Sequence, residues 1–100
     1  MRWRVAQVKR VSEWTCDAYD AWMKPLAGGD LAVVLWNRGT CGIHRRLTVQ
    51  WSTLGLPPAQ KMTVRDLFLR KDLGVSMHNF SSWVNVDDVI MVKLSEAKLL

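Results

Sequence analysis

The sequence has little of what marks a disulfide scaffold, a low-complexity chain or a membrane protein. Of its 100 residues, two are cysteine, three are proline and six are glycine, which excludes a disulfide-dense framework and a disordered Pro/Gly-rich chain. No run approaches the roughly 18 apolar residues of a membrane-spanning helix, and no apolar signal segment occupies the first fifteen residues. We therefore expect one soluble domain with no membrane or targeting segment of its own.

The basic charge of the chain is not gathered in one block. Fourteen Lys and Arg residues against nine Asp and Glu give a net charge of +5. The positive residues are scattered, and around Arg65 to Lys71 they alternate with Asp66 and Asp72. Nucleic-acid-binding domains usually concentrate basic residues on one face. The pattern predicts solvated loops and strand edges, and no nucleic-acid partner.

What the chain does have is repeated alternation of apolar and polar residues, which is typical of β-strands. Nearly half of the residues are apolar and six are tryptophan. We expect an all-β fold, a two-sheet antiparallel β-sandwich of about eight strands with Greek-key connections. The predicted strands are Val5–Val11, Tyr19–Lys24, Leu31–Asn37, Leu47–Trp51, Lys61–Leu69, Val75–Phe80, Ser82–Val86 and Val89–Leu94.

Turn residues divide these strands and suggest how they connect. Ala27–Asp30 contains two glycines and predicts a hairpin between the second and third strands. Leu54–Pro58 contains two prolines, which lack the N–H of a strand ladder, so it should connect the two sheets. Asp87-Asp88 predicts a tight turn before the last strand. We expect residues 1–18 to form an irregular N-terminal segment with the first strand, and residues 19–100 to form the sandwich.

The run Leu31–Trp36 is apolar at every position, although a half-buried strand normally alternates. Its larger aliphatic side chains, Leu31, Val33 and Leu35, should point inward. Further inward positions are Ala21, Met23, Val49, Val64, Val84, Val86 and either Val89 with Met91 or Ile90 with Val92. Ala32, Val34 and Trp36 then point outward beside Trp22.

These four outward residues are the predicted domain interface. Leaving an apolar side chain in water forgoes roughly 1.5–3 kcal/mol, and a whole domain is stable by only roughly 5–15 kcal/mol. A contiguous apolar patch usually marks an interaction site. We therefore expect a partner to cover Trp22, Ala32, Val34 and Trp36.

No residues form a convincing active site. The candidate carboxylate pairs are Asp17 with Asp20, Asp66 with Asp72, and Asp87 with Asp88, and all fall at turns or strand ends, where Asp commonly caps the backbone. His44 and His78 lack a nucleophile motif, and the Gly28-Gly29 pair precedes a strand instead of the helix of a phosphate loop. We predict no catalytic residue and no cofactor.

The two cysteines and one asparagine are the remaining candidates for a disulfide, a metal site and a glycosylation site. Cys16 and Cys41 can form one disulfide or none, because the sequence does not supply their Cα separation. Together with His44 and His78 they lack the two close-spaced pairs of a structural zinc site, so no metal is predicted. Asn79-Phe80-Ser81 is an acceptor triplet for N-glycosylation.

Several motifs, taken together, resemble a known family. They are the run AWMKPLAGGDLAVVLWNRG from Ala21 to Gly39, then VQWSTLGLPP from Val49 to Pro58, VRDLF from Val64 to Phe68 and KDLG from Lys71 to Gly74. In this order and spacing, they resemble the C-terminal β domain of family 27 glycoside hydrolases, the α-galactosidases or melibiases, over residues 20–94.

The resemblance implies an antiparallel sandwich that packs on a catalytic (β/α)8 barrel preceding it. The complete enzymes hydrolyse terminal α-galactosides with retention, through two barrel aspartates in Lys-Tyr-Asp and Asp-x-Trp-Arg motifs. Neither motif occurs here, since Ala18-Tyr19-Asp20 lacks the lysine. The chain is thus expected to be a non-catalytic domain that stabilises a barrel. Met1 stands where the barrel would end and this domain would begin, as expected of an excised module. The parent is expected to be secreted, lysosomal or vacuolar.

The chain departs from the family pattern at three places. Phe68 stands where tryptophan is usual, Asp87-Asp88 replaces a Pro-His-Gly-like turn, and Thr15-Cys16 lies in a segment without a counterpart. An alternative function is a carbohydrate-binding module in which exposed tryptophans stack on sugars. Two partners are therefore considered, the barrel and a carbohydrate.

Overall fold

The computed structural model describes residues 2–9 and 16–97, and its elements are almost all strands. The strands are β1 (Arg4–Lys9), β2 (Tyr19–Pro25), β3 (Leu31–Asn37), β4 (His44–Gln50), β5 (Met62–Asp66), β6 (Lys71–Ser76), β7 (Asn79–Asn85) and β8 (Val89–Glu96). Two short helical segments, η1 (Ala27–Gly29) and α1 (Trp51–Leu54), lie between strands. Residues 10–11 of the predicted first strand, and Thr15, lie outside the described residues. No helix in the described ranges has the length and apolar character needed to cross a bilayer.

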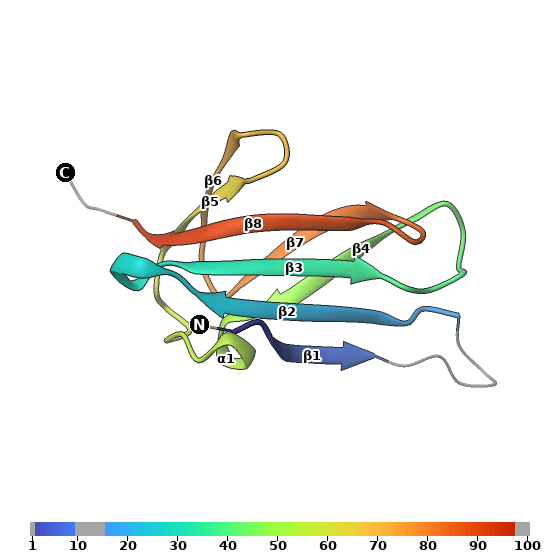
Figure 1. The fold of residues 1–100 in the computed structure, drawn as a ribbon, viewed down its shortest axis with the longest axis horizontal. Helices are drawn as coiled ribbons and strands as arrows, with labels where there is room; N and C mark the ends of the chain where they lie inside the picture. The colour runs from blue at the N-terminus through green and yellow to red at the C-terminus, as the bar shows by residue number, and fades with distance from the viewer. Residues whose placement is uncertain (1, 10–15, 98–100) are drawn as a thin grey trace.

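The strands form two antiparallel sheets, which confirms the predicted fold class. The large sheet has six strands in the order β1-β2-β3-β8-β5-β6, and the small sheet pairs β4 with β7. Figure 1 shows β4 and β7 crossing behind the large sheet. After β3 the chain crosses to β4 of the small sheet and returns to the large sheet in β5 and β6. It then crosses again to β7 and returns in β8, which lies between β3 and β5. These crossings are in line with Greek-key connections.

The hairpin between β2 and β3 forms where the glycines predicted it. Gly28 has a φ of 80°, a left-handed conformation that favours glycine, and the Leu26 N–H donates to the Asp30 carbonyl at 2.8 Å. The two strands pair over their whole length, with Tyr19 opposite Asn37 and Pro25 opposite Leu31. This pairing sets the faces of both strands.

The proline-containing segment connects the two sheets, as predicted, but the strand before it ends one residue earlier than expected. Trp51, expected as the end of a strand, begins α1 instead and is fully buried. Its indole N–H donates to the Gln60 carbonyl at 2.8 Å. An aromatic residue after an alternating strand resembles one more strand position, and a four-residue helix is too short to show helical periodicity.

The second half of the chain contains three further corrections. The strand predicted to run to Leu69 ends at Asp66, whose side chain accepts hydrogen bonds from the turn that follows. The segment Lys71–Ser76 is the edge strand β6, which was not predicted. The predicted strand Val75–Phe80 is wrong, because His78 has a φ of 73° and separates β6 from β7, while β7 absorbs most of Ser82–Val86.

The core lies between the two sheets, where their inward-facing side chains meet. Its buried members include Ala21, Met23, Leu31, Val33, Leu35, Leu47, Val49, Trp51, Met62, Val64, Phe80, Val84, Val92 and Leu94. On β8 the even-numbered set points inward, so the alternative with Ile90 and Val92 is the right one, whereas Val89 is 37% exposed. Val86, predicted inward, is only partly buried because it lies in the turn beyond β7.

Candidate functional site

The predicted interface residues lie on the outer face of the large sheet, away from the small sheet. Strand pairing places Val5 of β1 opposite Trp22, Trp22 opposite Val34, and Val34 opposite Met91 of β8. Directly paired residues share a face, so these four form an apolar row across four strands. Val5 is 46% exposed, and the other three are partly buried.

Trp36 belongs to the same face, next to an ion pair. It is paired with Asp20 on β2, and the Arg38 guanidinium lies 5.6 Å from the centre of its ring. Arg38 Nη2 donates to Asp20 Oδ1 at 2.8 Å, and Asp20 is only 7% exposed. At this distance the guanidinium and the indole make a cation–π contact, which favours the observed orientation of Trp36.

The other end of the face differs from the expectation in one respect. Ala32 points outward between Lys24 and Lys93, but it is only 3% exposed and presents almost no surface to a partner. Sequence reasoning also missed Trp3, which is 38% exposed. The Lys24 ammonium lies 5.9 Å from its ring. Among the described residues, the outer face therefore carries three tryptophans, Trp3, Trp22 and Trp36, where two were expected.

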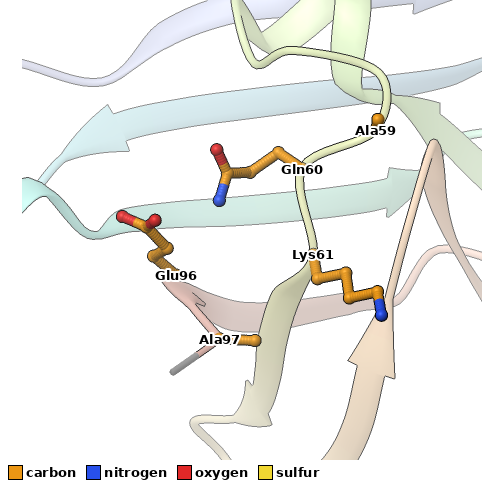
Figure 2. A pocket seen from close by; sticks show the side chains of 5 residues that line it. All are labelled: Ala59, Gln60, Lys61, Glu96 and Ala97. Atoms are coloured by element: carbon orange, nitrogen blue, oxygen red, sulfur yellow. The ribbon is translucent and has the colours of Figure 1, made fainter. Parts of the chain in front are cut away.

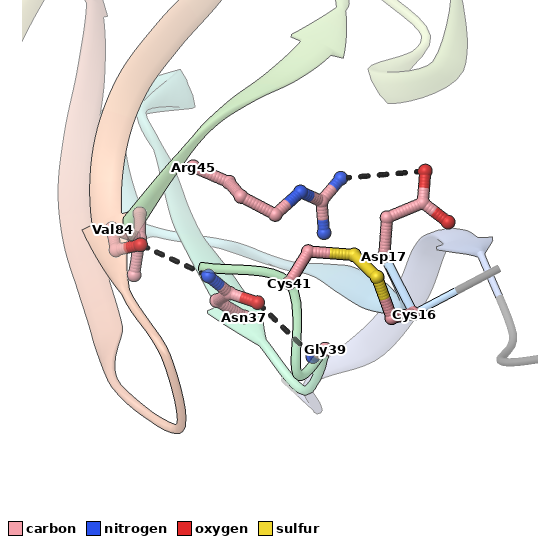
Figure 3. A network of polar contacts seen from close by, with 7 residues as sticks. All are labelled: Cys16, Asp17, Asn37, Gly39, Cys41, Arg45 and Val84. Atoms are coloured by element: carbon pink, nitrogen blue, oxygen red, sulfur yellow. Dashed lines mark hydrogen bonds and ion pairs between the residues drawn. A yellow bond between two sulfur atoms is a disulfide. The ribbon is translucent and has the colours of Figure 1, made fainter. Parts of the chain in front are cut away.

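A second cluster, the polar corner, joins distant segments at one end of the sandwich (Figure 3). A disulfide links Cys16 to Cys41, with their Cα atoms 5.2 Å apart. Arg45 Nη2 lies 3.7 Å from Asp17 Oδ2. The buried Asn37 side chain donates to the Val84 carbonyl at 3.0 Å and accepts from the Gly39 backbone N–H. These contacts hold the β3–β4 loop in place.

Asp66, Asp72 and Asp88, three of the candidate carboxylates, have structural partners. Asp66 Oδ1 accepts the N–H groups of Phe68 and Leu69 at 2.9 and 2.8 Å. Asp72 accepts from Arg65 Nη1 at 2.7 Å, and Asp88 Oδ1 accepts from the Val89 N–H at 2.7 Å. Such bonds stabilise turns and strand ends.

The histidines and cysteines, in the part of the chain that the structure describes, do not come together as metal ligands. No group of three or more His, Cys, Asp or Glu side chains could hold a metal ion there. His44 instead packs against Trp83, with ring centroids 4.7 Å apart and an interplanar angle of 71°. His78 occupies the bend between β6 and β7.

Two of the surface hollows differ in the side chains that line them. One of about 390 Å³ is lined by Ala59, Gln60, Lys61, Glu96 and Ala97. In Figure 2 its Gln60 and Glu96 side chains approach the same space while Lys61 points away. None of its described lining residues is aromatic. The other hollow, of about 270 Å³, has both Phe68 and Trp83 in its lining. The signal for it was present in the sequence, since an inward Val84 implies an outward Trp83.

Comparisons with known proteins agree with this fold. The family model described as alpha galactosidase C-terminal beta sandwich domain matches residues 16–94. Alpha-galactosidase 3 of Arabidopsis thaliana is 32% identical over 80 residues, which is 79% of this chain and 18% of that protein. The chain thus spans about a fifth of the length of this relative.

Two solved structures show the same architecture. A GH27 β-L-arabinopyranosidase from Geobacillus stearothermophilus superposes with a TM-score of 0.80 at 26% identity, covering 99% of this chain and 21% of that one. Alpha-galactosidase I from Mortierella vinacea gives a TM-score of 0.78 at 23% identity, covering 95% of this chain and 23% of that one. The predicted resemblance is confirmed, and the described residues contain the sandwich without a catalytic barrel. This chain belongs to the α-galactosidase C-terminal β-sandwich domain family of the GH27 glycoside hydrolases.

Proposed function

We propose that this domain docks through its outer face on a catalytic (β/α)8 barrel of a retaining α-galactosidase and stabilises that barrel. The observation that carries the proposal is the apolar row of Val5, Trp22, Val34 and Met91, which lies on the side of the large sheet that the small sheet does not cover. Burying such a row against a second domain would release water from apolar surface and favour association.

The charged residues around the row support docking of a mixed polar and apolar surface. Lys24 and Lys93 flank it at one end, and the Asp20–Arg38 ion pair flanks it at the other. Inter-domain interfaces commonly have this composition, an apolar centre with a polar rim. The choice of sugar is assigned to the barrel, because relatives that share this domain are named for both α-galactosides and β-L-arabinopyranosides.

The test compares matched tryptophan sites in the full-length polypeptide and in the 100-residue chain. Trp22→Ser combined with Val34→Ser should shorten the half-life of α-galactosidase activity at elevated temperature several-fold in the full-length protein. The same pair should cost the isolated chain no more than about 1 kcal/mol, as expected for partly exposed sites. Trp83→Ser, which removes an exposed indole outside the apolar row, is the control and should leave the half-life unchanged.

Two results would contradict the docking proposal. The first is an unchanged half-life in the double variant. The second is a loss of several kcal/mol in the isolated chain, which would place the two side chains in the core of this domain.

We also propose that the parent passes through the secretory route to the cell exterior, lysosome or vacuole, with a glycan on Asn79. Asn79 is the first residue of β7 and pairs with Gln50 on the solvent side of the small sheet. Ser81, the hydroxyl residue of the acceptor triplet, lies on the same side, with its Oγ 2.6 Å from Thr48 Oγ1. The Cys16–Cys41 disulfide also suits an oxidising compartment.

A further inference from the structure

An aromatic hollow lies at the edge of the outer face, where the β5–β6 turn, the end of β7 and the start of β8 meet, and its Val89 pairs with Trp36 of β3. Its volume is about 270 Å³, and its lining includes Phe68, Leu69, Trp83, Asn85, Asp88 and Val89. Phe68, Leu69 and Trp83 are 57%, 71% and 62% exposed. None of these residues belongs to the apolar row. Large apolar side chains gathered around a solvent-exposed hollow indicate a binding surface.

The fold holds the Trp83 side chain and the backbone of Phe68 in place. Trp83 projects outward from β7, paired with Arg46 of β4, and His44 packs against it at a centroid distance of 4.7 Å. Phe68 sits in a turn that Asp66 closes, since Asp66 Oδ1 accepts the Phe68 N–H at 2.9 Å. A platform ordered before binding loses little conformational entropy when a ligand arrives.

The polar groups of the hollow favour a neutral ligand that carries hydroxyls. Asn85 is exposed and its carboxamide can both donate and accept. Asp88 uses Oδ1 to accept the Val89 N–H, and its carboxylate keeps further lone pairs for a hydroxyl donor. No lysine or arginine is among the described lining residues. The carboxylates of Asp66 and Asp88 would repel an anion.

A pyranose ring combines the two properties that this lining requires. One face of the ring presents C–H groups, which suit an aromatic surface, and its edge carries hydroxyl groups. In galactose the axial 4-hydroxyl leaves an unbroken row of C–H groups on one face. The volume is just below the roughly 300–1,000 Å³ of typical small-molecule sites, which limits the occupant to one ring.

We propose that the aromatic hollow binds one neutral pyranose unit, with its C–H face on Trp83 and Phe68 and its hydroxyls on Asn85 and Asp88. This site would be a non-catalytic subsite for sugar. It does not depend on the docking of the outer face.

The experiment titrates methyl α-D-galactopyranoside into the ¹⁵N-labelled 100-residue chain and follows backbone and indole N–H signals by NMR. The expected result is a saturable shift of the Trp83 indole and the Asn85 amide signals. The contact area of one ring sets the dissociation constant on the order of 1 mM.

Five variants test the geometry. Phe68→Ala removes one of the two aromatic rings and should weaken binding. Trp83→Ala should weaken binding at least about tenfold, the loss expected when a stacking aromatic ring is removed, whereas Trp83→Tyr keeps a ring and should retain most of the affinity. Asp88→Asn keeps an acceptor without the charge and should let methyl α-D-galactopyranosiduronate, an anionic analogue, bind more tightly than it binds the unaltered chain. Trp3→Ala, which removes a 38% exposed indole next to β1 and outside the lining of the hollow, is the matched control and should bind as the unaltered chain does.

Three results would overturn the proposal. They are the absence of saturable shifts, binding that survives both Trp83→Ala and Phe68→Ala, and an equal loss in Trp3→Ala. Trp83 and Phe68 are largely exposed, so their removal should leave the fold intact, and dispersion of the remaining NMR signals checks this directly.

Discussion

The five tryptophans that the structure describes differ in burial, and this difference predicts different effects on stability. Trp51 has no exposed surface, and its indole N–H donates to the Gln60 carbonyl at 2.8 Å. Truncating a buried Trp to Ala costs about 3–5 kcal/mol through lost burial and the cavity that remains. A domain is stable by only about 5–15 kcal/mol. Trp51→Ala should therefore remove a large part of the free energy of unfolding.

The perturbation is measured by urea denaturation followed by far-UV circular dichroism, which does not depend on the removed fluorophore. With a slope of about 1.5 kcal/mol/M, a loss of about 4 kcal/mol lowers the urea midpoint by about 2.7 M. Trp51→Phe keeps most of the apolar contact but leaves the Gln60 carbonyl without its donor. It should cost about 1–3 kcal/mol, which keeps the test informative if the Ala variant does not fold.

Trp83→Ala serves as the matched control, because that side chain is 62% exposed. It should change stability by no more than about 0.5 kcal/mol, a midpoint shift of about 0.3 M at the same slope. The reasoning is refuted if Trp51→Ala and Trp83→Ala shift the midpoint equally, because burial would then not distinguish the two sites.

Three further predictions concern the polar corner and the small sheet. Replacing Cys16 and Cys41 by Ser opens a loop with a sequence separation of 25; the chain-entropy model gives a loss of about 3.5 kcal/mol, and dithiothreitol should lower the urea midpoint of the unaltered chain but not of the double variant. Gly39→Ala would place a Cβ against the Cys16 carbonyl and 3.1 Å from the Ala18 nitrogen, so it should cost about 2–3 kcal/mol. Gly28→Ala is the control, because its Cβ meets nothing within 4 Å and its positive φ costs about 1 kcal/mol. An equal loss at both sites would contradict the close approach at Gly39. Asn79→Gln should abolish a glycosidase-sensitive mass shift of the chain secreted from eukaryotic cells, and a shift that persists would place the glycan elsewhere.

The faces of the central strands were predictable, because they follow from local alternation. Leu31, Val33 and Leu35 point inward as expected, and Val34 and Trp36 point outward. In a strand the side-chain period is two residues, so once Leu31, Val33 and Leu35 point inward, Val34 and Trp36 must point outward. The β2–β3 hairpin was also readable, since a left-handed turn position favours glycine.

The failures occurred where local pattern and burial do not coincide. Strand β6 is exposed at almost every position and lies at the edge of the large sheet, so it has no buried face to produce alternation. The segment around Trp51 shows the opposite problem, because a buried aromatic residue looks the same in a short helix and in a strand. Ala32 had the right direction, yet the flanking Lys24 and Lys93 leave it almost no exposed surface.

By itself the sequence determined the all-β class, the direction of the central side chains, the hairpin and the family resemblance, because each of these depends on residues close together in the chain. Only the tertiary structure decided that β8 lies between β3 and β5, that Cys16 reaches Cys41, and that Phe68 and Trp83 line one hollow. Those outcomes depend on which strands pair and how the two sheets pack, and many strand orders bury the same alternating faces.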